Sequence, residues 1–290
     1  MLKKRLIACI VVRDGLVVQS IGFQRYLPIG RPKIAIEFVA RWDVDEIVVL
    51  DISATRQGRG PDFDVIGMAV EQCFVPLTVG GGIRSLSQVT AAMRAGADKI
   101  AINTMAIDSP AFITECADAY GSQCIVVSID ARETEPGRYE VFRDSGTHGT
   151  GLDPAAWAAE VEGYGAGEIL INSIDRDGSK RGYDLALIRK VSDAVSIPVI
   201  ACGGVGTYSH FAPGIAEAGA SAVAAANIFH YIEHSTIVAK AHLRRAGIDV
   251  RLDSLAHYGK FNFDDHGRLL KLSDEELEAI VHTRYVRKAT

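Results

Sequence analysis

The stretch Thr-Val-Gly-Gly-Gly-Ile at residues 78–83 decides the fold, and residues 201–206 echo it as Ala-Cys-Gly-Gly-Val-Gly. Each stretch follows a short apolar run opened by a proline, which is typical of a buried parallel strand. Glycines at the carboxyl end of a strand let backbone N–H groups approach an anion closely, and a following helix N-terminus favours negative charge. A single glycine pair is more often a tight turn. Two copies predict two phosphate-binding turns.

The two glycine-rich turns belong to a longer internal repeat. Gly81 and Gly96 in the first half recur as Gly203 and Gly219 in the second half, at nearly the same spacing. Chance turns would not keep one register over both pairs, so the chain consists of two similar halves. Two further pairs of apolar runs align in the same way: residues 46–51 with 168–173, and residues 7–12 with 126–131.

Strand-like and helix-like patterns alternate along most of the chain, with no break in composition through residue 252. Eight such units favour an α/β fold of the closed (β/α)8 type, a TIM barrel built from two half-barrel repeats, over an open doubly wound sheet. We therefore expect a barrel at residues 1–252 and a short C-terminal extension at residues 253–290. Within the extension, residues 261–267 suggest a hairpin, and residues 273–281 suggest a helix that begins with a capping box.

Composition limits the expected partners. The 290-residue chain has a net charge of −5 and no long basic run, which argues against nucleic acid and leaves small molecules or another protein. No apolar run approaches the ~20 residues of a membrane span. The five cysteines contain no CxxC pair, which is typical of a reduced cytoplasmic protein. His230 and His234 suit a solvated helix face, and we expect neither a metal nor a cofactor.

Acidic residues close or follow several predicted strands. Asp51 and Asp130 end two apolar runs, and Asp177 lies in a polar loop after a third. In the repeat, the position equivalent to Asp130 is Val11. A symmetric site for a substrate with two phosphate ends would carry one carboxylate from each half, one as acid and one as base. The valine predicts an altered reaction, unless Asp51, Asp177 or Asp14 replaces the missing acid.

Several longer sequence words resemble the cyclase subunit family of imidazole glycerol phosphate synthase, over roughly residues 1–252. These words are Val-Gly-Gly-Gly-Ile at 79–83, Gly-Ala-Asp-Lys at 96–99, Asn-Thr at 103–104, Gly-Ser-Gln at 121–123, Ser-Ile-Asp-Arg-Asp-Gly at 173–178 and Gly-Tyr-Asp at 182–184. In that family, a (β/α)8 barrel receives ammonia from a separate glutaminase through its interior. The barrel delivers the ammonia to a substrate with two phosphates at the other rim. The resemblance therefore implies a lyase-type synthase subunit of a glutamine amidotransferase, a glutaminase partner and a phosphorylated small-molecule substrate.

The resemblance also implies roles for individual residues. Asp130 matches the family's second catalytic acid, and Asp98 matches a position that docks the glutaminase. The two phosphate sites match Gly82, Asn103 and Thr104 in the first half, and Gly204 and Asn227 in the second. The mouth where ammonia enters matches a ring of four charges: Arg5, Glu46, Lys99 and Glu168. All four stand at or beside the first residue of a predicted strand, so their side chains can converge at one mouth of a barrel.

Two departures from the family pattern bear on the reaction. The family's first catalytic aspartate falls at Val11, and its substrate-gripping lysine falls at Gln19. Valine cannot exchange a proton, and loss of one member of an acid–base pair costs about 10²–10⁴ in rate. A branch of the family with such replacements resembles the ammonia-delivering partners of surface-polysaccharide (lipopolysaccharide) biosynthesis, where an acetamido group on a sugar becomes an acetamidino group. Residues 50–55, 61–64 and 72–76 are similar to that branch.

Three functions remain open at this stage. The first is an ammonia-using synthase with altered chemistry, forming an amidine on a surface-polysaccharide sugar. The second is a working cyclase of histidine biosynthesis. The third is a barrel without chemistry of its own, which conducts ammonia and activates a glutaminase.

Overall fold

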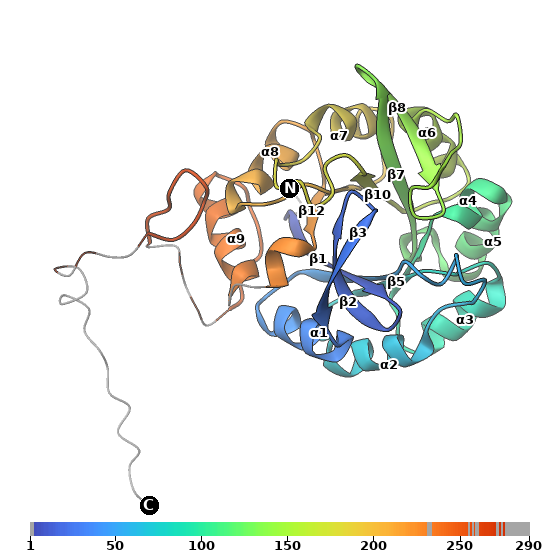
Figure 1. The fold of residues 1–290 in the computed structure, drawn as a ribbon, viewed down its shortest axis with the longest axis horizontal. Helices are drawn as coiled ribbons and strands as arrows, with labels where there is room; N and C mark the ends of the chain where they lie inside the picture. Colours follow the sequence, from blue (N-terminus) through green and yellow to red (C-terminus); the bar gives the residue numbers. More distant parts are fainter. Residues whose placement is uncertain are drawn as a thin grey trace, which may run out of the picture.

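Eight parallel strands close into a barrel in the computed structural model, which describes residues 3–230, 234–254, 256, 258, 261–270, 273 and 275. In chain order the barrel strands are β1 (Arg5–Arg13), β4 (Glu46–Asp51), β5 (Leu77–Gly80), β6 (Lys99–Ile102), β7 (Ile125–Glu135), β10 (Glu168–Ser173), β11 (Val199–Cys202) and β12 (Ala222–Ala225). The ring closes because β1 pairs with both β4 and β12, and β10 pairs with both β7 and β11 (Figure 1). The predicted TIM barrel is confirmed.

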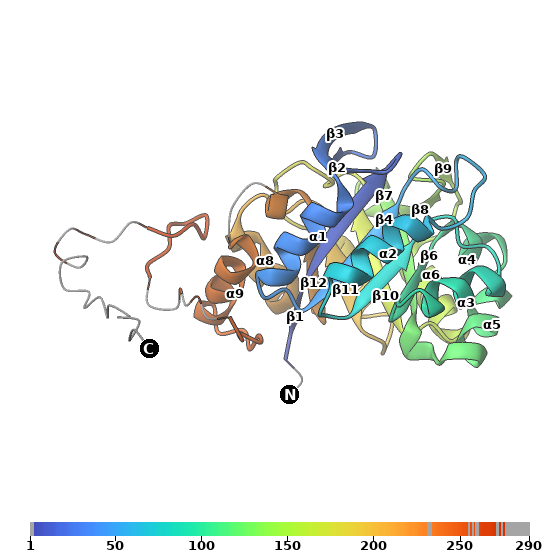
Figure 2. The same cartoon turned by 90° about the horizontal axis from the view of Figure 1, so that it is seen from below.

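Helices surround the barrel and cover its outer face (Figure 2). They are α1 (Pro32–Arg41), α2 (Phe63–Gln72), α3 (Leu86–Arg94), α4 (Thr104–Asp108), α5 (Ala111–Tyr120), α6 (Pro154–Gly163), α7 (Leu185–Ser192), α8 (Phe211–Ala216) and α9 (Ser235–Arg245). Short 3₁₀ turns occur at η1 (Ser122–Cys124), η2 (Tyr208–His210) and η3 (Asn227–His230). Local sequence sets several helix starts, since Ser85 caps α3, and Asp153 caps α6 directly before a proline. Apolar helix faces pack on the outward side chains of the strands in one large core.

The barrel interior forms a second, smaller apolar cluster, separate from the outer core. Side chains alternate along each strand, so on β1 Leu6 and Ala8 face the helices, while Ile7 and Cys9 face the interior. Small residues fill much of the inner cluster, notably Ala222 and Ala224 on β12. This packed layer separates a charged mouth at the amino ends of the strands from a pocket at their carboxyl ends.

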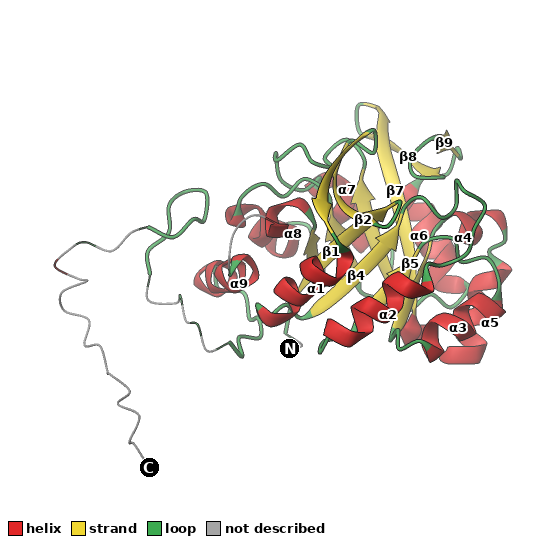
Figure 3. Ribbon diagram, turned by 60° about the horizontal axis from the view of Figure 1, so that its bottom comes forward, coloured by secondary structure: helices red, strands yellow, loops and turns green. Residues whose placement is uncertain are grey.

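Two strands continue past the carboxyl end of the barrel into hairpins, which Figure 3 shows beyond the barrel rim. β1 turns at Asp14–Gly15, both with positive φ, into β2 (Leu16–Ile21), which pairs with β3 (Arg25–Gly30). β7 likewise turns into β8 (Arg138–Arg143), which pairs with β9 (His148–Gly149). The two hairpins stand at equivalent positions of the two half-barrels.

The described part of the C-terminal extension packs against α9 and the turn before α8. An antiparallel bridge joins Phe263 and Leu269, and the Phe263 ring lies 5.5 Å from the His242 ring of α9. The backbone N–H of Ser209 donates to the His266 carbonyl at 3.2 Å. Most of the predicted helix at residues 273–281 lies outside the described residues.

Candidate functional site

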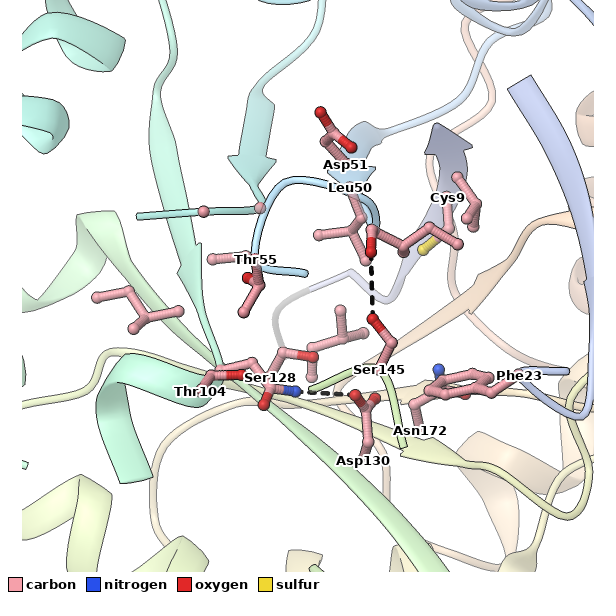
Figure 4. A pocket seen from close by; sticks show the side chains of 18 of the residues that line it. Cys9, Phe23, Leu50, Asp51, Thr55, Thr104, Ser128, Asp130, Ser145 and Asn172 are labelled. Carbon is pink, nitrogen blue, oxygen red and sulfur yellow. Dashed lines mark hydrogen bonds between the residues drawn. The ribbon is translucent and has the colours of Figure 1, made fainter. Parts of the chain in front are cut away.

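A pocket opens at the carboxyl ends of the barrel strands, and Figure 4 shows it from close by. Its lining combines the ends of β1, β4, β6, β7 and β10 with the loops that follow β4, β5 and β10. Among the predicted site residues, the lining includes Asp51, Gly82, Asn103, Thr104, Asp130 and Asp177. Gly204 and Asn227 follow β11 and β12 at the same end of the barrel but lie outside this lining.

Asp130 is the buried acid of the pocket. Its side chain is only 8% exposed, and burial raises the pKa of its carboxyl to about 7. The Nδ2 amide of Asn103 donates to its Oδ2 at 2.8 Å, which opposes that rise, while the nearby Asp177 carboxylate adds to it. A carboxyl with a pKa near neutrality exists in both protonation states at pH 7. Asp130 is therefore suited to both giving and taking a proton.

Val11 lies on the opposite side of the pocket from Asp130. β1 and β7 stand four strands apart in the eight-stranded ring, so they face each other across the interior. Val11 is in register with Leu50 of β4, and both side chains line the pocket. One wall thus carries an acid, and the facing wall is apolar.

Asp51 lines the pocket but is engaged by its own loop. Its Oδ1 accepts from the backbone N–H of Ser53 at 3.0 Å and from the Ser53 hydroxyl at 2.7 Å. Its Oδ2 forms an ion pair with Arg59 at 2.5 Å. Figure 4 shows this carboxylate turned away from Asp130. Its contacts make Asp51 the anchor of the loop after β4, with no oxygen directed at the acid across the pocket.

Asp177 and Asp14 also hold loops. Asp177 Oδ2 accepts from the Ser20 hydroxyl at 2.6 Å and from the backbone N–H of Phe23 at 3.2 Å, which ties the loop after β10 to the β2–β3 hairpin. Burial raises the pKa of Asp177. Asp14 accepts from the exposed Gln57 amide at 2.7 Å and lies outside the pocket lining.

The first glycine-rich turn fits an anion at the pocket wall. Gly82 has φ of 72°, and a Cβ there would lie 2.5 Å from the Arg59 carbonyl, so only glycine is accommodated. Among the residues that the structure describes, no acceptor takes the backbone N–H groups of Gly82, Ile83 or Thr104. Groups of this kind bind phosphate oxygens.

An acidic loop touches the same site. The backbone N–H of Asp144 donates to the Thr104 hydroxyl at 3.2 Å, and that hydroxyl lies 3.5 Å from Asp144 Oδ1. His148 and Arg143 lie 3.3 Å and 3.9 Å from the other carboxylate oxygen. An anion held by Thr104 would therefore have a carboxylate as its neighbour.

The second glycine-rich turn is more tightly packed than the first. A Cβ at Gly204 would lie 2.2 Å from the Gly182 carbonyl, and the Gly204 carbonyl accepts from the Gly182 N–H at 2.9 Å. Asn227 donates its side-chain amide to the Ser20 carbonyl of the β2–β3 hairpin at 2.8 Å. Gln19 of the same hairpin lies 3.4 Å from the Asn227 carbonyl. The hairpin therefore covers the end of β12, and the segment around Gly182 packs on the glycine-rich turn.

The four predicted ring residues meet at the amino-terminal mouth. Arg5 donates to Glu46 at 2.7 Å and to Glu168 at 2.6 Å, and Lys99 Nζ lies 3.1 Å and 2.8 Å from the same two carboxylates. Thr78 adds a hydrogen bond to Glu46 at 2.9 Å. Burial alone would lower the pKa of Arg5, but Glu168 and Glu46 outweigh it and raise that pKa. Charges of alternating sign thus form a closed ring across the mouth.

The surface beside this mouth carries Asp98 and an exposed aromatic side chain. Asp98 is exposed, and its Oδ2 accepts from the backbone N–H of Leu77 at 2.8 Å, which fixes the start of β5. Phe74, in the loop that leads to β5, is 88% exposed.

Metal and membrane features are limited in the part of the chain that the structure describes. It contains no group of three or more His, Cys, Asp or Glu side chains that could hold a metal ion. The interpretation of His230 as part of a solvated helix face was wrong, because His230 ends η3 and its burial lowers its pKa to about 4. Within the same residues, no helix has the length and apolar character to cross a membrane.

The sequence revealed neither Asn172 in the pocket lining nor the loop residues that engage Asp51. Asn172 stands next to Asp130 on the neighbouring strand, and the repeat gave no hint of it because its equivalent is Leu50. Arg59 forms an ion pair with Asp51, and Ser53 donates hydrogen bonds to it, both from the loop after β4. Such loop contacts depend on backbone turns that have no periodic signal.

The chain is thus an α/β-barrel protein with an acid-bearing pocket at one end of a closed eight-stranded barrel and a charged ring at the other. This chain belongs to the histidine biosynthesis protein family, which matches residues 5–235. It is also similar to a protein of Vibrio vulnificus (strain YJ016) named "Putative imidazole glycerol phosphate synthase subunit hisF2". The two are 52% identical over 268 residues, which cover 92% of this chain and 98% of the relative.

Proposed function

We propose that this chain is a synthase subunit that receives ammonia from a partner glutaminase and uses it on a phosphorylated substrate. The reaction that fits best turns an acetamido group on a surface-polysaccharide sugar into an acetamidino group. The observation that carries the proposal is the contrast between the two mouths. The ring of Arg5, Glu46, Lys99 and Glu168 is complete, while the pocket offers Asp130 opposite an apolar Val11.

The chemistry requires one nitrogen to replace one oxygen. Ammonia attacks the acetamido carbon, the C–O bond breaks, and the amidine and water are the products. Asp130 would carry two protons in turn from the attacking nitrogen to the leaving oxygen, which departs as water, a role that its pKa of about 7 supports. The apolar wall at Val11 suits a methyl group of the substrate better than it suits a charged group.

Ammonia would enter the barrel at the ring, and the glutaminase would dock beside the ring. Asp98 and Phe74 supply a charged and an apolar contact on that face. Phosphate would bind at Gly82, Asn103 and Thr104, and a second phosphate at Gly204 and Asn227. The free backbone N–H groups of the first turn support the first of these sites.

A histidine-pathway cyclase is the second candidate, since the V. vulnificus relative carries a name from that pathway. It would need a new acid in place of Val11. Asp51 and Asp177 line the pocket, but both hold loops through charged or hydrogen-bonded partners. An assay with the biosynthetic ribonucleotide and ammonium salts separates the two functions. Turnover at ordinary enzymatic rates would refute the amidine proposal.

The third candidate is a barrel that only conducts ammonia. Asp130→Asn and Lys99→Ala distinguish it from a synthase, in a coupled assay with the glutaminase. We expect Asp130→Asn to abolish product formation with either glutamine or ammonium salts. If Asp130→Asn has no effect while Lys99→Ala abolishes glutamine-dependent turnover, the barrel is a conduit and the pocket does no chemistry.

A further inference from the structure

A second pocket opens beside the acid-bearing pocket at the same rim of the barrel. It lies between the end of β1, the β2–β3 hairpin and the loop after β4, and its lining includes two arginines, Arg13 and Arg56. Tyr26 and Ile52 line both pockets, so the pockets meet at these two side chains. A molecule bound in the first pocket can therefore extend into the second.

The positive charge of the second pocket exceeds its negative charge. Among the described residues, its lining contains one carboxylate, that of Asp14. Asp14 Oδ2 lies 3.6 Å from Arg13 Nε, while its Oδ1 accepts from the Gln57 amide at 2.7 Å. The Arg56 side chain is exposed and has neither an ion pair nor a hydrogen bond with any described residue. Two cations thus share one acid.

The loop after β4 does not need Arg56 to hold its shape. Arg59, three positions further along the same loop, pairs with Asp51 and donates to the Ser53 hydroxyl at 3.0 Å and to Gln57 at 2.7 Å. These contacts fix the loop from within. Arg56 makes no comparable contact, so a structural role does not account for it.

The second half-barrel neutralises the arginine that is equivalent to Arg13. The repeat places Arg132 at the position of Arg13 and Asp175 at the position of Ser53. Arg132 Nε lies 3.8 Å from Asp175 Oδ1, in the loop after β10. In the first half, a serine stands where that acid would be, and the loop carries Arg56 in addition. The first half has therefore gained positive charge at a position where the second half is balanced.

The wall that carries Arg13 is already in place for binding. The guanidinium carbon of Arg13 lies 4.5 Å from the centre of the Tyr26 ring, and the Tyr26 hydroxyl donates to the Phe23 carbonyl at 2.8 Å. The backbone N–H of Asp14 donates to the Ser53 hydroxyl at 3.1 Å, which ties the turn after β1 to the loop after β4. A group that is held before binding loses little freedom when it takes an anion.

We propose that this second pocket binds a phosphate group of the acceptor substrate, at a place separate from both glycine-rich turns. Arg13 and Arg56 approach from two different elements, which suits an anion with oxygens on several sides. Phosphate has this shape, whereas a carboxylate presents two oxygens in one plane. Only the assignment of the phosphate to the acceptor rests on the proposed function; phosphate binding by the two arginines does not.

The test is an NMR titration of the full-length chain, labelled with ¹⁵N, with inorganic phosphate at constant ionic strength. It follows the Nε–H signal of Arg13, which is assigned by its loss in Arg13→Gln. Because the signal belongs to one side chain, phosphate bound at the glycine-rich turns does not obscure it. We expect a saturable shift, and we expect Arg56→Gln to weaken this binding about fivefold, because one of two charged contacts is lost at an exposed site.

Arg25→Gln is the matched control. Arg25 is exposed on the same hairpin but lies outside the lining of the second pocket, so this variant loses the same charge. Its phosphate affinity at Arg13 should stay within about twofold of the unaltered chain, since salt screens distant charges. The absence of a saturable shift, or equal weakening in Arg56→Gln and Arg25→Gln, overturns the proposal. Sodium acetate that binds as tightly as phosphate also overturns it, because the site would then suit a carboxylate.

An ammonium-dependent assay tests the link to the acceptor. With an acetamido sugar phosphate that the unaltered chain converts, Arg56→Gln should raise KM for that sugar. An unchanged KM would overturn the assignment of the phosphate to the acceptor. If the unaltered chain forms no amidine, the proposed function is refuted and the phosphate titration still stands.

Discussion

Asp130 makes the stability of the protein depend on pH in a way that one substitution removes. Its pKa rises from 3.8 to about 7 on folding, chiefly because of burial. Each pH unit of this rise in pKa corresponds to about 1.4 kcal/mol, so the charged carboxylate destabilises the fold by ~4 kcal/mol at alkaline pH. Between pH 4 and 7 the folded state binds the proton more tightly than the unfolded state, so stability falls as pH rises through this window. About 3 kcal/mol of the loss occurs between pH 5 and 8.

Asp130→Asn removes this proton and should flatten the pH dependence. The assay is urea denaturation of both proteins at pH 5 and at pH 8, from which four free energies of unfolding follow. Contributions from other titrating groups cancel when the pH effect in the variant is subtracted from that in the unaltered protein. We expect this difference in the free energy of unfolding to be about 3 kcal/mol. From pH 5 to pH 8 the variant should therefore become more stable relative to the unaltered protein. Equal pH dependence in the two proteins would refute the burial argument for Asp130.

Three further predictions concern the ring, the phosphate turn and the docking face. Lys99→Met leaves two buried glutamates with one cation and should lower the free energy of unfolding by roughly 3–5 kcal/mol, measured by urea denaturation. An unchanged denaturation curve would show that Lys99 does not stabilise the ring. Asp144→Asn removes a carboxylate 3.5 Å from the Thr104 hydroxyl and should strengthen inorganic phosphate binding about fivefold by calorimetry. Equal phosphate affinity in the variant and the unaltered protein would show that phosphate does not bind beside Thr104. Phe74→Ser should weaken glutaminase binding at least about tenfold while ammonium-dependent turnover stays the same. Equal binding would remove Phe74 from the interface.

The barrel could be predicted from sequence because its signals are periodic. Proline-opened apolar runs and glycine-rich ends mark the strands, and the internal repeat fixes their order. The four ring charges came from the family resemblance, and their convergence agreed with the same logic, since each stands at a strand start. Parallel strands in a closed ring bring their first residues together without any help from loops.

Features that depend on burial of polar groups could not be predicted. Lys240 in α9 is fully buried and pairs with Asp45 at 2.7 Å, so it breaks the apolar pattern that would have marked this helix. Asp51 ends a strand as Asp130 does, but only the structure shows that Arg59 returns from the loop to pair with it. Asn172 has a leucine as its repeat equivalent, so symmetry concealed it.

Because β1 and β7 extend beyond the barrel rim, the pocket and the barrel itself can change independently of each other. Both strands carry a hairpin, β2–β3 and β8–β9, so the roof of the pocket consists of two appendages attached to a rigid cylinder. Lengthening or rewriting either appendage reshapes the pocket, and leaves the charged ring at the opposite end of the barrel untouched. Under the proposed function, such a barrel can keep one nitrogen donor while its pocket comes to accept different substrates.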